Sequence, residues 1–158
     1  MHYLIKAYAA GKNIMELESI KMQTDIFESF SPELQEALLA EILMAFIQPE
    51  SDEEMPEIDM QEMYEAFIML LEAVKNGDDV FMKAVLGVGV EREHPLDIEY
   101  YTKFHLERDK GMAEKIDGFL KSGDNGDYFI IAGAAHFVGE NTITGLLEAM
   151  GYTLERIK

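Results

Sequence analysis

The chain contains four histidines, and His136 is the one whose surroundings suggest chemistry. It follows an unbroken apolar run at residues 128–132, which predicts a strand buried on both faces. A neutral imidazole just beyond the carboxyl end of such a strand can ligate a divalent metal or act as a base near neutral pH. Gly133 would let the backbone turn sharply and approach a ligand closely, which makes it a candidate cofactor-binding residue. The competing hypothesis is that His136 is a histidine hydrogen-bonded to a neighbouring backbone carbonyl.

Glu18 and Arg108 are the other candidate catalytic residues. Glu18 ends an expected strand at residues 13–17, so it opens onto the same sheet edge as His136 where the two strands are neighbours. One carboxylate and one imidazole form half of a metal site, or an acid–base pair. Arg108, flanked by two acids, could orient a carboxylate or bind a substrate anion through its planar guanidinium. The alternatives are a helix-capping or surface acid at Glu18 and a structural ion pair at Arg108.

The remaining motifs point to no further site. His2, His94 and His105 match no metal-ligand spacing and are expected at the surface or in ordinary hydrogen bonds. The glycines at residues 87–89 lack the lysine and serine or threonine of a phosphate loop. Residues 50–65 hold eight acids and no base, but they do not match the EF-hand spacing, so a solvated loop is expected. The absence of cysteine excludes a disulfide scaffold, a thiolate zinc site and a cysteine nucleophile.

Composition and charge narrow the class of protein. The chain has 158 residues, 48% of them hydrophobic and 28% charged, as expected for a single folded domain over residues 1–158. Thirty-one acidic and 13 basic residues give a net charge of -18, which disfavours nucleic acid as a partner. No apolar run is long enough to cross a membrane, and the first residues do not resemble a signal peptide. We therefore expect a soluble, acidic chain whose compartment the sequence leaves open.

The elements that must position the candidate residues are mostly helices. Cap residues and apolar spacing predict helix starts at Ser19, Ser31, Asp59, Asp78 or Asp79, and Pro95, with further helices after Asp109 and after His136. Strands are expected at residues 13–17, 128–132 and 152–157, and the last two would flank a helix as in a strand–helix–strand unit. The pattern predicts an α/β fold that is rich in helix and has a small central sheet.

The residues from Tyr128 through Gly133 and His136 to Gly151-Tyr152 resemble the C-terminal signature of the TraB/GumN family, which includes the PrgY and Tiki-like proteins. In that family a strand runs into a Gly-x-x-His motif, and a helix then ends at Gly-Tyr before a last strand. Three further blocks match in the same order: Leu17-Glu18-Ser19 with Gln23, Asn76-Gly77-Asp78, and Glu107-Arg108-Asp109 with Met112-Ala113 and Lys115-Ile116. The resemblance covers nearly the whole chain except about 48–60 and 87–100.

The resemblance implies an α/β fold related to erythromycin-esterase-like and haem-binding ChaN-like proteins. For the Tiki branch it implies proteolysis that depends on a divalent metal, here Mn, Co or Zn. His136 corresponds to the second Gly-x-x-His histidine, Glu18 to the family acid and Arg108 to the family arginine. The implied roles are metal ligation by His136 and Glu18, water activation by the metal, and stabilisation of a carboxylate or oxyanion by Arg108.

One departure from the family pattern bears on activity. The family has a first Gly-x-x-His motif on an N-terminal strand, and this sequence has none before residue 133. The chain is then a fragment holding the C-terminal portion of the family fold, a short relative without activity, or a chain whose partner supplies the missing strand. A missing strand would leave a sheet edge bare, which favours homo-oligomers.

Two functional hypotheses follow. The first is a metal-dependent hydrolase, peptidase-like, that is incomplete or inactive as this chain. The alternative is a non-catalytic binding or oligomerisation module of the same fold, which would take a peptide or a small, haem-like ligand. Family members are often exported or membrane-tethered, and this chain carries no such signal.

Overall fold

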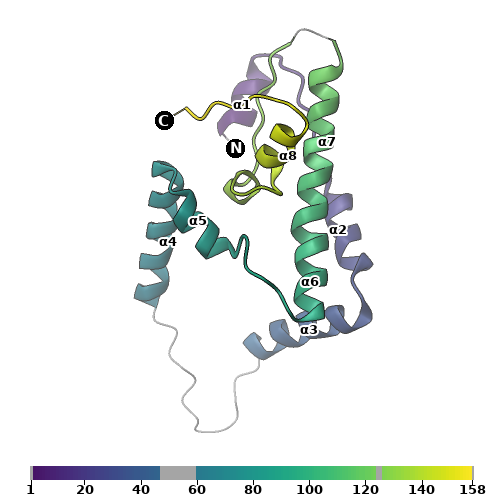
Figure 1. Cartoon of the computed structure of the whole chain (residues 1–158), viewed down its shortest axis with the longest axis vertical. Coiled ribbons are helices and arrows are strands. Elements are labelled where there is room, and N and C mark those ends of the chain that lie inside the picture. The colour runs from purple at the N-terminus through teal and green to yellow at the C-terminus, as the bar shows by residue number, and fades with distance from the viewer. Residues whose placement is uncertain (1, 47–59, 124–125, 158) are drawn as a thin grey trace.

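The structure, a computed structural model, describes residues 2–46, 60–123 and 126–157. These residues form helices joined by turns and extended segments (Figure 1). In chain order the helices are α1 (His2–Ala9), α2 (Ile20–Ser29), α3 (Pro32–Phe46), α4 (Met60–Asn76), α5 (Asp79–Leu86), α6 (Pro95–Tyr101), the π-helical turn η1 (Thr102–Leu106), α7 (Glu107–Lys121), the 3-10 turn η2 (Ala134–Phe137) and α8 (Ile143–Ala149).

The long helix α7 is the centre of the arrangement. It continues from α6 through η1 without a break, and α8 packs against it (Figure 1). The α4 and α5 helices pack on each other, while the short turn η2 contacts α8. The turn that carries His136 lies next to α7, whose first turn holds Arg108 and Asp109.

The core lies between α7 and α8. Met112 and Ile116 of α7 are buried against Ile143 and Leu147 of α8. Extended segments cover this pair with single apolar side chains: Leu17, Ile130, Ala132 and Tyr152. A second, smaller cluster joins α4, α5 and the segment after η2 through Ala73, Met82 and Val138. The hydrophobic core thus fixes the segments on either side of His136.

The predicted α/β class is wrong for the part of the chain that the structure describes, because that part is helical and contains no strand. The three expected strands are extended segments, and none of the backbone hydrogen bonds of the described residues joins one of them to another. Without a partner an extended segment is not a sheet strand.

The apolar run at 128–132 also fails the prediction of burial on both faces. Ile130 and Ala132 pack on the α7–α8 core, whereas Phe129 is 75% exposed and Ile131 is 55% exposed. A period-two alternation places one face inward and leaves the other outward. Oligomerisation through a bare sheet edge accordingly loses its basis, since the described residues form no sheet.

The helix signals of the sequence are confirmed where the structure describes them. The Ser19 hydroxyl accepts a hydrogen bond from the Met22 amide at 3.1 Å, and an Asp78 carboxylate oxygen accepts one from the Phe81 amide at 3.0 Å. Pro95 occupies the first turn of α6. The predicted start at Asp59 lies outside the described residues.

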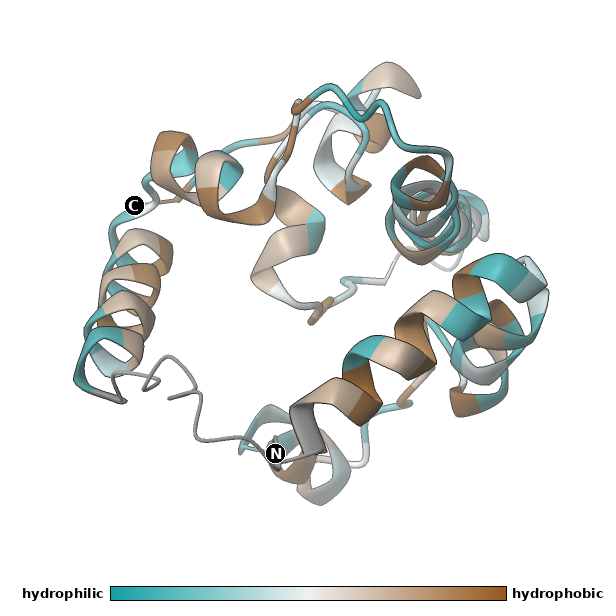
Figure 2. Ribbon diagram, turned by 90° about the horizontal axis from the view of Figure 1, so that it is seen from below, coloured by the Kyte–Doolittle hydropathy of each residue, from teal (hydrophilic) through white to brown (hydrophobic). Residues whose placement is uncertain are grey.

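Large apolar side chains remain exposed along several helices. The hydropathy colouring in Figure 2 shows apolar residues distributed along the helices. They include Leu39, Ile42 and Met44 of α3 and Met63 and Phe67 of α4. The buried core is therefore concentrated around α7 and α8, where the candidate residues lie.

Candidate functional site

The site begins with two neighbouring residues in the first turn of α7, Arg108 and Asp109. Adjacent positions on a helix do not face the same way, so the two side chains can contact different parts of the molecule. Arg108 pairs with Glu18, and Asp109 contacts His136. One helical turn thus holds the acid and the histidine that the sequence singled out.

The Glu18–Arg108 pair is a two-pronged ion pair. Arg108 Nε donates to Glu18 Oε1 at 2.8 Å, and Nη2 donates to Oε2 at 2.6 Å. The two side chains are only 10% and 14% exposed. The structural ion pair that the sequence left open for Arg108 is therefore present, and it fixes the segment before α2 against α7.

The pair shifts the ionisation of both partners. Hydrogen bonds from Arg108 hold the pKa of the Glu18 carboxyl below its usual value although burial opposes this, and Gln23 and His136 add smaller effects. The same hydrogen bonds raise the pKa of Arg108. Glu18 is thus a carboxylate whose two oxygens already accept hydrogen bonds, which suits positioning better than proton transfer.

The second pair joins Asp109 Oδ1 to His136 Nδ1 at 2.5 Å. The Asp109 side chain is 6% exposed and the His136 side chain 15% exposed. A carboxylate at Nδ1 favours the tautomer protonated there and leaves the lone pair of Nε2 for another partner. This is the arrangement that orients a metal-ligating or basic imidazole. The hydrogen-bond partner of His136 Nδ1 is thus the Asp109 carboxylate and not a backbone carbonyl.

The structure brings the three predicted residues together. Glu18 and His136 both reach α7, and His136 lies near enough to Glu18 to influence the pKa of its carboxyl. The described residues contain no sheet edge, which was the predicted meeting point. Glu18 and His136 are instead brought together by their contacts with Arg108 and Asp109 in the first turn of α7. Asp109, which makes the connection, was treated in the sequence only as a neighbour of Arg108.

His105 is the residue near this site that sequence reasoning missed. It lies on the π-helical turn η1, one helical turn before Asp109, and is half-buried. Burial lowers the pKa of its imidazole, while the Asp109 charge opposes that shift. π-Helical turns often occur at functional sites. The signal available in the sequence was the spacing His105-x-x-x-Asp109, which places both residues on one helix face.

A hollow of about 270 Å³ adjoins Asp109 and His105. Tyr101 forms part of its wall, with the Arg92 guanidinium 3.5 Å from the centre of the ring. The turn after η2 closes the other side through Gly139, Glu140, Asn141 and Thr142. The buried carboxylate of the Asp109–His136 pair therefore has a small cavity beside it.

Two glycines hold the turn after His136 in place. Gly139 has a φ of 128°, and a Cβ there would lie 2.7 Å from a Val88 methyl carbon. At Gly145 a Cβ would lie 2.1 Å from the backbone oxygen of Glu140. Gly133 differs, because its φ of -62° is open to any residue and an added Cβ would make an ordinary contact with His136. The backbone does not require glycine at 133, and its cofactor-binding role stays a prediction.

The described residues do not by themselves complete a metal centre. No group of three or more His, Cys, Asp or Glu side chains in this part of the chain is arranged to hold an ion. A catalytic zinc takes three protein ligands. Both oxygens of Glu18 are engaged by Arg108, which leaves Nε2 of His136 as the donor that the geometry offers. The predicted ligation of Mn, Co or Zn by Glu18 together with His136 is thus at most part of a site.

None of the helices in the described ranges is long and apolar enough to cross a bilayer.

Comparison with known proteins adds a family and two relatives. A sequence profile of the TraB/PrgY/gumN family matches residues 1–156. A protein described as "Metalloprotease TIKI homolog" from Nematostella vectensis is 31% identical over 70 residues, which cover 43% of this chain and 15% of that protein. "Metalloprotease TIKI2" from Xenopus tropicalis is 32% identical over 60 residues, which cover 38% of this chain and 12% of that protein.

The matched part is thus a small share of either metalloprotease, less than a sixth of its length. No solved structure matches the chain significantly.

Proposed function

The chain belongs to the TraB/PrgY/gumN family, and from this premise we propose that it supplies part of the active site of a peptidase-like hydrolase that depends on a divalent metal. Two observations support the proposal. The described residues place a carboxylate-oriented histidine and an arginine-held glutamate on one helical turn. The relatives that match part of the chain carry names that describe them as metalloproteases.

The observation that carries the proposal is the Asp109–His136 contact. The largely buried Nδ1 of His136 needs a hydrogen-bond partner, and the partner that it has at 2.5 Å is a carboxylate. Because the carboxylate engages Nδ1, Nε2 can accept a proton or bind a ligand, and the negative charge stabilises the imidazolium that proton transfer creates.

The other residues have supporting roles in this proposal. Arg108 and Glu18 neutralise each other, and their pair positions the segment at residues 17–19 beside His136. Asp109 orients the reacting imidazole. The further donors that Mn, Co or Zn requires come from outside the described residues, and no step is assigned to the metal here.

The Asp109–His136 contact is also why we prefer a hydrolase to a non-catalytic module. The described residues contain no sheet, so they offer no sheet edge through which the chain could oligomerise. A small, haem-like ligand remains a prediction that no particular contact favours.

The test is divalent-metal binding by the purified chain, with Co²⁺ titrated by calorimetry and absorption. We expect saturable binding that His136→Ala weakens by about tenfold or more, since the removed group would be a direct ligand. His2→Ala is the matched control, because His2 is an exposed histidine on α1. Equal affinity in the wild type and His136→Ala would contradict the role of His136.

A further inference from the structure

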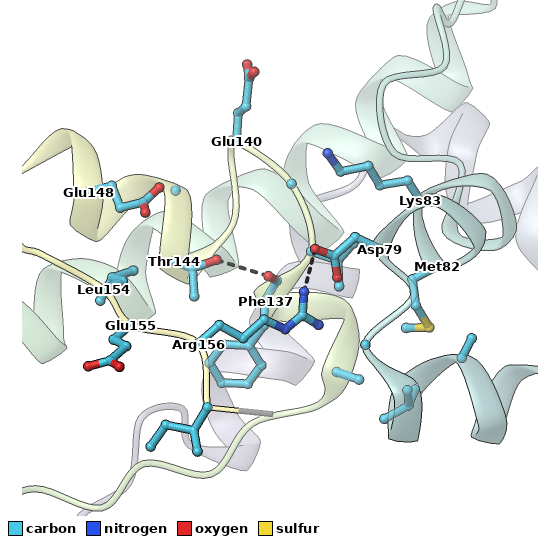
Figure 3. Close-up of a pocket in the computed structure, with 18 residues that line it drawn as sticks. Asp79, Met82, Lys83, Phe137, Glu140, Thr144, Glu148, Leu154, Glu155 and Arg156 are labelled. Carbon is cyan, nitrogen blue, oxygen red and sulfur yellow. Dashed lines mark hydrogen bonds and ion pairs between the residues drawn. The ribbon is translucent and has the colours of Figure 1, made fainter.

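A second hollow lies against η2, the turn that carries His136 (Figure 3). Its volume is about 750 Å³. α5, η2, the start and end of α8 and the C-terminal extended segment form its walls. It shares Lys83, Gly139 and Glu140 with the smaller hollow beside Asp109, so the two spaces adjoin. A molecule in the large hollow would thus lie beside the His136 turn.

One wall of this hollow is an extended backbone without partners. Residues 154–157 line it, and no backbone hydrogen bond of the described chain involves residues 153–157. The same residues are exposed. Although the described residues form no sheet, the open N–H and C=O groups of this extended segment can pair with a second extended chain, in the manner of β-strand addition.

The floor of the hollow is apolar. Met82 and Val138 are buried there, and Phe137 and Leu154 are partly exposed toward it (Figure 3). Alternate side chains of an added strand point to opposite faces. Every second side chain of a bound peptide would therefore meet this apolar floor, while the side chains between would meet the rim.

The charged groups of the rim decide which peptide fits. Asp79 and Arg156 neutralise each other in an ion pair of 2.7 Å. Glu140, Glu148 and Glu155 line the hollow, and within the described chain the carboxylate of none of them has a hydrogen-bond or ion-pair partner. Lys83 is the unpaired base opposite these three acids. The remaining field favours a cationic peptide, in agreement with the net charge of -18.

We propose that this hollow binds an extended peptide with alternating apolar and basic side chains, which adds as a strand along residues 153–157. The apolar side chains occupy the floor at Met82 and Val138, and the basic ones contact Glu148 and Glu155. This inference deepens the proposed function, because the bound peptide would be the substrate, held beside the His136 turn. Only the cleavage of the peptide rests on the proposed function. Binding itself requires no cleavage.

The test is fluorescence anisotropy with a labelled peptide that alternates valine and lysine. We expect saturable binding, and no binding of the matched peptide that alternates valine and glutamate. The double variant Glu148→Lys/Glu155→Lys should bind the basic peptide about tenfold more weakly or worse, because like charges then face each other. Glu36→Lys/Glu41→Lys is the control with the same net charge, since both of those acids are exposed on α3 and outside the hollow.

A second probe tests the backbone pairing. The valine–lysine peptide methylated on alternate amide nitrogens keeps its side chains and charges but cannot donate along one edge. We expect its binding to be lost. Equal binding of the methylated and unmethylated peptides, or equal weakening by the two charge-reversed variants, would overturn the proposal. So would self-association that Glu148→Lys/Glu155→Lys abolishes without any peptide binding, because a second copy would then be the occupant.

Failure of the inference can be separated from failure of the proposed function. His136→Ala should lose metal affinity and keep peptide affinity, and Glu148→Lys/Glu155→Lys should do the reverse. Metal binding through His136 without any peptide binding contradicts the inference alone. Peptide binding together with metal binding that is unchanged in His136→Ala contradicts the proposed function alone.

Discussion

Asp109 Oδ1 lies 2.5 Å from Nδ1 of His136, a contact that joins the first turn of α7 to a turn 27 positions later in the chain. Arg108, the residue before Asp109, makes an equally close pair with Glu18 in the opposite direction along the sequence. Two consecutive residues thus tie three separate segments together.

Asp109→Ala is expected to lower the free energy of unfolding by about 1–3 kcal/mol, because it leaves the largely buried Nδ1 of His136 without an acceptor. Asp109→Asn keeps the size of the side chain and an accepting oxygen, so its loss should be smaller. Urea denaturation measures both. Glu114→Ala, an exposed change on the same helix, is the control, and an Asp109→Ala loss no larger than that of the control would refute the prediction.

Removing one partner of the Glu18–Arg108 pair should destabilise the protein by about 2 kcal/mol. The value lies below the cost for a fully buried pair because these side chains keep some exposure. Glu18→Gln and Arg108→Leu test each side, and Arg108→Lys should be nearly as harmful since lysine cannot form both hydrogen bonds. The exposed Lys21–Asp25 pair is the comparison, and Lys21→Ala should change the stability little because solvent screens that pair. Equal losses at the two pairs would contradict the geometry.

The Glu99 carboxyl should make the free energy of unfolding depend on pH in the acid range. Hydrogen bonds from the Ser31 hydroxyl and from Lys103 lower the pKa of Glu99 to about 2 from an ordinary 4.5. A depressed carboxyl pKa contributes stability that is fully present above pH 4.5 and is lost as the pH falls toward 2. Chemical denaturation across this window should show wild-type stability falling more steeply than that of Glu99→Gln. Parallel profiles would show that the bond to Ser31 is absent in solution.

Gly145 and Gly118 provide a matched pair of Gly→Ala substitutions. A Cβ at Gly145 would collide with the Glu140 backbone at 2.1 Å, so Gly145→Ala should destabilise by about 1–3 kcal/mol as the turn after His136 shifts. Gly118 lies within α7 with nothing near its added Cβ, so Gly118→Ala should stabilise by about 0.5–1 kcal/mol. Thermal unfolding would show opposite signs, and a neutral Gly145→Ala would contradict the close approach.

The helices could be predicted from local chemistry. Ser19, Asp78 and Pro95 mark helix starts because a cap or a fixed φ acts within a few residues. Local chemistry could not decide whether a sheet forms. An apolar run such as 128–132 indicates only that a segment is extended or buried. Whether it becomes a strand depends on a distant partner. In the described residues Ile130 and Ala132 pack on α7 and α8, and no backbone hydrogen bond joins this segment to another extended segment.

The sequence singled out His136, Glu18 and Arg108, whose roles stay predictions, but it did not indicate how they are connected. His136, Glu18 and Arg108 do gather, yet the sequence offered a sheet edge as the reason, while the structure uses the neighbouring positions 108 and 109. Pairings across 90 and 27 positions have no local signature. His105 was dismissed for lack of ligand spacing, although its place one turn before Asp109 could be read from helix periodicity.

The central claim is that Asp109 holds His136 with its Nε2 lone pair free. Long-range ¹⁵N NMR of the histidine rings, with His136 assigned by His136→Ala, measures the tautomer directly. We predict that neutral His136 carries its proton on Nδ1 in the wild type and that Asp109→Ala loses this preference. We also predict that Zn²⁺ shifts the ¹⁵N resonance of Nε2. A wild-type His136 protonated on Nε2, or one whose tautomer is unchanged in Asp109→Ala, would contradict it.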